Sequence, residues 1–230
     1  MRDNSWARLL RLIGIVLMSL TALFTLMGGA GTSCVALNPT GYEGKFVGIA
    51  PFQWLYLLFV IVTLAVGAAG VRAVVQLVRG TRTAYRVSLV ALAAGITIGV
   101  LHMITSRSLR GGSMPVDMVV YTTVLTLIVF LLFRIPRVWQ GVNFEKPDGG
   151  TGAGPKAAAI ASVACGVLAL SIQFLMAPTH TIGGVNYADA WHWSMSGVGL
   201  ALIVMGVVSF MRQATRIRGD ALNPLPAPAN

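Results

Sequence analysis

Charged residues are scarce in this chain of 230 residues: Asp, Glu, Lys and Arg make up 10% of it, whereas hydrophobic residues make up 56%. A soluble domain carries about 25% charged residues, so the chain lacks the polar surface that a water-soluble globule of this length needs. The composition excludes an ordinary cytosolic enzyme and a disordered polypeptide. It predicts an all-α, polytopic membrane protein.

Cysteine is also scarce. The two cysteines, Cys34 and Cys165, cannot form a disulfide-rich scaffold or a metal site made of cysteine alone. Cys34 is expected in an outer loop and Cys165 inside a helix, so a disulfide between them is not favoured. Cys165 stands among small apolar residues, and a thiol in such surroundings is inert.

Six apolar runs are long enough to cross a membrane, which takes about 20 residues of helix. None of them contains a charged residue in its central part. The sequence therefore predicts a single domain over residues 1–220, a bundle of six transmembrane helices. The runs cover residues 9–29, 52–74, 87–105, 116–133, 157–176 and 191–211.

Two segments outside these runs are expected to be irregular. Residues 148–155 are rich in glycine, as flexible linkers are, and residues 221–230 are rich in proline, which favours a disordered tail. Residues 1–33 have an alternative interpretation as a signal peptide that is cleaved before Cys34. Cleavage would leave five helices, but the length of the first apolar run favours an uncleaved span.

Basic residues are distributed unequally along this chain of net charge +10. Every Lys and Arg except Lys45, Arg107 and Arg110 flanks the first or last run, or lies around the connections after the second and fourth runs. Short loops rich in Lys and Arg stay in the cytoplasm. We therefore expect both termini in the cytoplasm, in a cell membrane that we take to be the bacterial plasma membrane, and no nucleic-acid partner.

Two of the three histidines are expected inside helices, close to the outer surface. His102 follows Gly99 on a face of small residues, and His192 begins a stripe that continues with Ser196, so both are expected to point toward other helices at similar depth. Two histidines on facing helices could ligate a haem, one could hold the magnesium of a chlorin, and either could donate a hydrogen bond to a quinone. Alternatively, each histidine bonds only to a backbone carbonyl or to water.

Ionisable residues are missing from the middle of every predicted span. Ion-coupled transporters usually carry such groups there, so active transport is not favoured, although a passive channel stays open. The acidic residues of the outer loops are not held together by any motif, and Asp117 is expected to form a surface ion pair with Arg110. The sequence assigns no catalytic residue and no metal site, and it does not indicate an enzyme.

Aromatic residues stand among glycines in two outer loops, Tyr42 and Phe46 in the first and Tyr187 in the last. They are candidates for a partner-contact surface, or they simply cap the bundle. Small-residue faces on the helices also favour close helix packing. The first functional hypothesis is therefore a non-catalytic subunit or scaffold of a larger membrane complex, in contact with the lipid bilayer and with other membrane protein subunits. The second is a redox or pigment-binding protein that uses His102 and His192, and the third is a small-molecule channel or carrier.

Overall fold

The structure, a computed structural model, describes residues 5–147 and 153–222, with side chains up to Thr215. Its long helices are α1 (Ser5–Leu37), α2 (Gln53–Arg79), α3 (Ala84–Arg110), α4 (Val116–Leu132), α6 (Ala153–His180) and α7 (His192–Leu222). Shorter elements are α5 (Pro136–Val142), the 3-10 helices η1 (Val47–Phe52) and η2 (Tyr187–Trp191), and a hairpin of β1 (Thr181–Ile182) and β2 (Val185–Asn186). The all-α class predicted from the sequence is confirmed.

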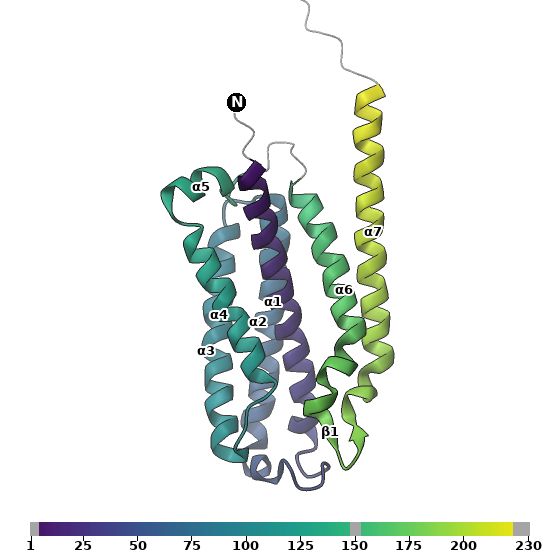
Figure 1. Ribbon diagram of the computed structural model, residues 1–230. Helices are drawn as coiled ribbons and strands as arrows, with labels where there is room; N and C mark the ends of the chain where they lie inside the picture. Colours follow the sequence, from purple (N-terminus) through teal and green to yellow (C-terminus); the bar gives the residue numbers. More distant parts are fainter. Residues whose placement is uncertain (1–4, 148–152, 223–230) are drawn as a thin grey trace, which may run out of the picture.

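Five of the described helical segments are long and apolar enough to cross a membrane on their own, and the bent pair of α4 and α5 makes a sixth candidate. The two helices of this pair meet at an angle of 97°. α4 has 17 residues, which is within the range that spans a bilayer, and α5 turns aside at the end of the bundle (Figure 1). The molecule is thus a polytopic helical bundle, and α5 lies in a segment where the sequence predicted no helix.

The long helices run side by side, and α1 occupies the middle of the bundle (Figure 1). α1 packs against α2, α4 and α6, and α3 packs against α2 and α4. Among the described long helices, α7 packs extensively only on α6. The bundle therefore consists of a compact group, α1 to α4, to which the pair of α6 and α7 is joined mainly through α1.

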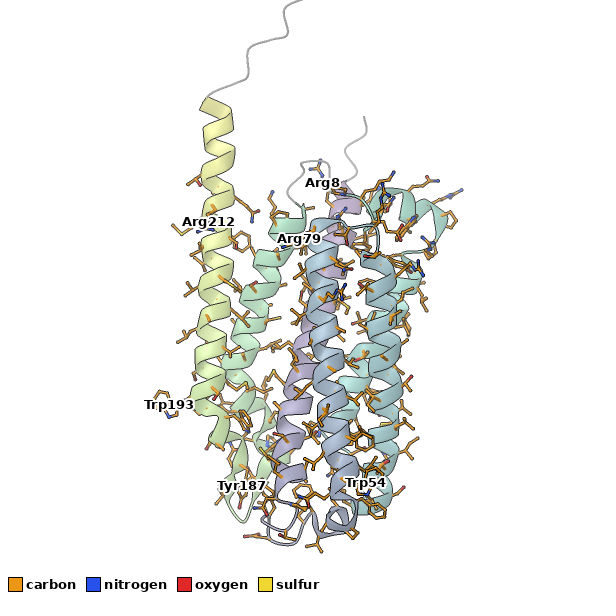
Figure 2. The ribbon with its side chains drawn as sticks, turned by 180° about the vertical axis from the view of Figure 1, so that it is seen from behind. Arg8, Trp54, Arg79, Tyr187, Trp193 and Arg212 are labelled. Atoms are coloured by element: carbon orange, nitrogen blue, oxygen red, sulfur yellow. The ribbon has the colours of Figure 1, made fainter. Side chains whose placement is uncertain are left out.

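The two ends of the bundle differ in charge. Arg8, Arg79 and Arg212 lie toward the end that also carries α5, and we call it the arginine end (Figure 2). The opposite end carries the loop of residues 38–46, η1, the β-hairpin and η2 (Figure 1). We call it the cavity end, for the cavity described below.

Arg11 ties three segments together at the arginine end. It is only 6% exposed, and it donates hydrogen bonds to the carbonyl oxygens of Leu77 (3.4 Å), Lys146 (2.9 Å) and Asn143 (3.5 Å). Close by, Gly80 ends α2 in the left-handed conformation (φ 66°), and a Cβ there would lie 2.2 Å from the carbonyl oxygen of Lys146. The sequence counted Arg11 among the basic residues that flank the first span, but the structure buries it.

Small residues bring α6 and α7 close together. A Cβ added to Gly166 would lie 2.6 Å from the carbonyl oxygen of Gly199, and one added to Gly199 would lie 2.8 Å from that of Gly166. Such approaches leave no room for a larger side chain. The small-residue patterns of these two helices therefore form their mutual interface, as membrane helices that associate by close packing require.

Several segments differ from the sequence-based expectation. α1 continues to Leu37, where the following Asn38-Pro39 disfavours further helix, so Cys34 lies in the last turns of α1 and not in a loop. In the predicted linker, residues 148–152 lie outside the described residues, and residues 153–155 form the first turn of α6. In the predicted tail, residues 223–230 lie outside the described residues, and residues 221–222 end α7.

Candidate functional site

A cavity of about 660 Å³ lies at the cavity end, between α1, α4 and α6. Small-molecule pockets typically measure about 300–1,000 Å³, so this cavity is large enough to hold a ligand. Its lining extends along α6 from Leu168 to His180. At the helical rise of 1.5 Å per residue, this segment is roughly 18 Å long, so the cavity runs along several turns of α6.

The part of the cavity nearer the middle of the bundle is apolar. Its walls include Phe24 of α1, Val119 of α4, and Leu168 and Ile172 of α6. Flexible methionine side chains, which adapt to irregular shapes, contribute more of the lining. These are Met27, Met114, Met118, Met176 and Met195.

Two of the lining residues are exposed on the side of the bundle. Met118 of α4 and Leu175 of α6 both line it, and they are 50% and 53% exposed. Each of the two helices packs on α1, and α1 forms the wall between them. The side of the cavity between α4 and α6 therefore lies toward the space that lipid chains fill around a membrane protein.

The part of the cavity near the loops is polar and is covered by aromatic rings. The ring of Tyr42 packs edge-on against Phe46 (5.6 Å between centroids) and Tyr187 (4.9 Å), and all three residues line the cavity. Burial raises the pKa of Tyr42 above its usual value of 10.0, with smaller contributions from Cys34 and Tyr187. Its hydroxyl therefore stays protonated at neutral pH.

The three aromatic residues singled out in the sequence thus come together in one cluster that joins the first and last loops. We call Tyr42, Phe46 and Tyr187 the aromatic cap. Each is partly buried, because each packs on another member of the cluster. Their predicted role in partner contact stays a prediction, but the structure gives them a contact within the chain.

His102 is buried against two aromatic rings and faces the cavity. Its ring stacks on Phe59 at 4.6 Å and meets Tyr56 edge-on at 5.3 Å. The side chain is 5% exposed and lines the cavity. Among the described residues none forms a hydrogen bond with its imidazole, although buried polar groups are normally hydrogen-bonded. An imidazole always carries at least one N–H donor, so His102 can donate a hydrogen bond to water or to another molecule in the cavity.

The other two histidines have partners within the chain. Nδ1 of His180 lies 3.1 Å from the carbonyl oxygen of Met176, and this residue also lines the cavity. Nδ1 of His192 forms a hydrogen bond with Oε1 of Gln173, and His192 is not among the lining residues. The structure therefore brings His180, and not His192, to the same cavity as His102. Among the described residues no group of three or more His, Cys, Asp or Glu side chains is arranged to hold a metal ion.

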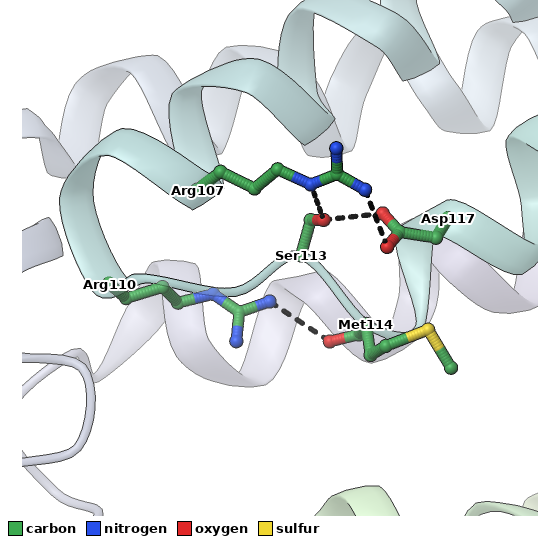
Figure 3. A network of polar contacts seen from close by, with 5 residues as sticks. All are labelled: Arg107, Arg110, Ser113, Met114 and Asp117. Carbon is green, nitrogen blue, oxygen red and sulfur yellow. Dashed lines mark hydrogen bonds and ion pairs between the residues drawn. The ribbon is translucent and has the colours of Figure 1, made fainter.

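Two arginines near the end of α3 take different partners (Figure 3). Arg107 forms an ion pair with Asp117 (Nη2 to Oδ2, 3.1 Å) and donates a hydrogen bond to Ser113 (2.9 Å). Arg110 donates to the carbonyl oxygen of Met114 (2.9 Å), and its guanidinium lies 5.5 Å from the centre of the Phe46 ring. The predicted pairing of Asp117 with Arg110 is therefore wrong, because Arg110 faces the loop of residues 38–46 instead.

Sequence reasoning singled out His102 of α3 but missed that Arg110 lines the same cavity. His102, Ser106 and Arg110 are spaced by four residues, which places them on one face of a helix. Ser106 bonds to the hydroxyl of Tyr56 (2.8 Å), while His102 and Arg110 line the cavity. The spacing of these polar residues by four, at the end of an apolar run, is the sequence pattern that could have predicted a polar face of α3.

Comparison with known proteins gives no further guide to the function: no family model, curated protein or solved structure matches the chain. The residues of the cavity and the packing of the helices are therefore the basis for a functional proposal. The cavity combines three features that bear on its occupant: an apolar interior, a polar end under the aromatic cap, and a buried histidine that has no hydrogen-bond partner among the described residues.

Proposed function

We propose that the protein binds one amphiphilic, lipid-like molecule in the cavity between α1, α4 and α6, without catalysing a reaction on it. His102 carries the proposal. It is an almost fully buried imidazole that faces the cavity, with no hydrogen-bond partner among the described residues. A polar group without a hydrogen-bond partner costs free energy, so a polar atom of a molecule in the cavity would be stabilised beside His102.

The distribution of polarity in the cavity favours an amphiphile over a water-soluble solute. An apolar chain fits between Phe24, Val119 and Ile172, while a polar head fits beneath the aromatic cap. The side of the cavity between Met118 and Leu175 lets such a molecule enter from the bilayer. With both termini in the cytoplasm, as the arginine distribution favours, the head lies at the outer surface of a bacterial plasma membrane.

The cofactors considered from the sequence fit this cavity unequally. A quinone is itself an amphiphile, and one of its carbonyl oxygens would accept a hydrogen bond from His102. A haem or a chlorin would rely on His102 as a ligand without His192, whose Nδ1 bonds to Gln173. We therefore keep a quinone as a candidate occupant, and we give haem and chlorin less weight.

The test is to fill the cavity and measure what the protein retains. Gly31 lines the cavity, and a Cβ there meets no atom within 4 Å, so Gly31→Leu places a side chain inside it. Gly197 on α7 has the same open surroundings but does not line the cavity, so Gly197→Leu is the matched control. We expect native mass spectrometry of detergent-purified protein to find one retained amphiphile on the wild type and on Gly197→Leu, and none on Gly31→Leu. Equal retention by both variants, or none by the wild type, would overturn the proposal.

A second proposal, independent of the first, is that the chain assembles with another membrane protein through α7. In the candidate span that contains α7, 11% of the most apolar window is buried, against 22% to 39% for the other single spans. Apolar residues such as Leu200 and Val204 are exposed along it. We expect a photo-crosslinker at Val204 to capture a different membrane protein, and gentle extraction to give a native mass well above that of the chain. A monomer without crosslinks, or a homo-oligomer alone, would contradict this proposal.

A further inference from the structure

We infer that the head of the bound amphiphile is an anion, a phosphate or a carboxylate, recognised by Arg110 and Lys45. This inference rests on the proposed function, because it concerns the polar end of the same cavity. It goes further in assigning the chemical class of the ligand and the residues that select it.

The charges that line the cavity are of one sign. Arg110 and Lys45 are lining residues, and no Asp or Glu is among them. Of the acidic residues at this end of the bundle, Glu43 lies against Gly183 of the hairpin and is not a lining residue. Asp117 is paired with Arg107, and Asp189 accepts a hydrogen bond from Asn186 (3.1 Å). A molecule in this cavity therefore meets positive charge at the polar end, with no carboxylate in the lining to balance it.

Arg110 is held in place without an ion-pair partner among the described residues. The hydrogen bond to Met114 and the contact with the Phe46 ring fix the position of the guanidinium. This leaves further N–H groups, because an arginine side chain has five donors. Within the described part of the chain, no carboxylate forms an ion pair with it, whereas Arg107, one turn away, has Asp117 (Figure 3).

An anionic head matches these donors better than a neutral one. Arginine binds phosphate and carboxylate through parallel, charge-assisted hydrogen bonds, which are stronger than those between neutral groups. His102 lies on the same face of α3 and lines the same cavity. It therefore offers a further hydrogen bond at a position nearer the middle of the bundle than Arg110. Lys45, on the exposed loop, adds a second cation at the mouth.

The experiment compares three probes of equal chain length, each with a photoreactive group in the chain: a fatty acid, an alkyl phosphate and a fatty alcohol. The full chain is placed in phosphatidylcholine nanodiscs, and cavity labelling is measured by peptide mass mapping as a function of probe concentration. The variants are Arg110→Gln, Arg110→Lys and Lys45→Gln. Arg86→Gln is the control, since Arg86 is an exposed cation on the same helix but lies away from the cavity.

We expect at least one anionic probe to label the cavity. The fatty alcohol should need a concentration at least roughly 10-fold higher for the same labelling. Arg110→Gln should weaken the anionic probes by about the same factor and leave the alcohol unchanged, while Arg110→Lys retains part of the preference. Arg86→Gln should behave as the wild type. Lys45→Gln changes an exposed loop residue, so it tests the inference even if Arg110→Gln does not fold.

The outcomes separate the inference from the proposed function. Equal labelling by the alcohol, with no effect of Arg110→Gln or Lys45→Gln, overturns the anionic head and leaves a neutral amphiphile such as a quinone. Gly31→Leu is labelled in parallel. If every probe labels the cavity of the wild type no more strongly than that of Gly31→Leu, the amphiphile site itself is overturned. If inorganic phosphate displaces the alkyl phosphate at equal concentration, the anion alone is the ligand, and the lipid-like character of the proposal is wrong.

Discussion

Tyr42 and Tyr187 meet edge to face with ring centroids 4.9 Å apart, and this contact joins the first loop of the chain to the last across the mouth of the cavity. Aromatic pairs of this geometry contribute about 0.5–1.5 kcal/mol beyond their buried area. On its own, this contact is therefore weak enough to open. An occupant of the cavity would be shielded from water by a cover that is easily displaced.

The first prediction concerns this aromatic cap. Tyr187→Ala should speed hydrogen exchange of the backbone amides in residues 38–46, because the loop loses its partner across the mouth. Tyr187→Phe should change little, since it keeps the ring. Trp193→Ala is the control for loss of an aromatic ring, because Trp193 is 85% exposed. Exchange that is unchanged in Tyr187→Ala would show that the two loops are held by other contacts.

The second prediction concerns Arg11. Arg11→Leu removes a guanidinium that donates to three carbonyl oxygens from α2 and from the segment after α5. Hydrogen bonds that involve a charged group contribute about 1.5–3 kcal/mol each, so we expect a loss of at least 2 to 3 kcal/mol in the free energy of unfolding. Denaturant titration of the purified protein measures it. Arg82→Leu, which replaces an exposed arginine of the α2–α3 turn, should stay close to wild type.

The third prediction concerns the contact between α6 and α7. Gly166→Ala places a Cβ 2.6 Å from the carbonyl oxygen of Gly199, so the helices must move apart, at a cost of about 1–3 kcal/mol. Gly197→Ala meets no atom within 4 Å and should be neutral or slightly stabilising, because alanine favours helix over glycine. A lower midpoint of thermal unfolding for Gly166→Ala than for Gly197→Ala is the expected result. The reverse order would contradict the interface.

The sequence predicted the helical class and the small-residue contact faces, because both depend on patterns that are local to one segment. It missed α5, whose seven residues are too few to show a periodicity. It also placed Cys34 in a loop, although α1 extends to Leu37. Hydropathy marks the part of a helix that lies in lipid, and it does not mark where the helix continues beyond that part.

The candidate site was harder to predict, because helical phase gives the direction of a side chain but not the helix that it meets. The phase of His192 indicated a contact face, and the structure confirms a contact, with Gln173 of α6. His102 was placed on a face with Gly99, and in the structure it packs against Tyr56 and Phe59 of α2. Only the packing order of the helices distinguishes these two environments, and a single sequence does not contain it.

The fourth prediction separates the two histidines that the sequence treated alike. His102→Ala removes the imidazole that faces the cavity, and the loss of one hydrogen bond, about 0.5–1.5 kcal/mol, should weaken retention of the bound molecule roughly threefold to tenfold. His102→Gln, which keeps a donor, should lose less. His192→Ala breaks the bond to Gln173 outside the cavity lining and should leave retention unchanged. The visible absorption spectrum of the same samples tests the redox and pigment hypothesis: a band that His102→Ala shifts or removes would identify a chromophore on His102, whereas equal effects of the two alanine variants on retention would show that His102 has no special role.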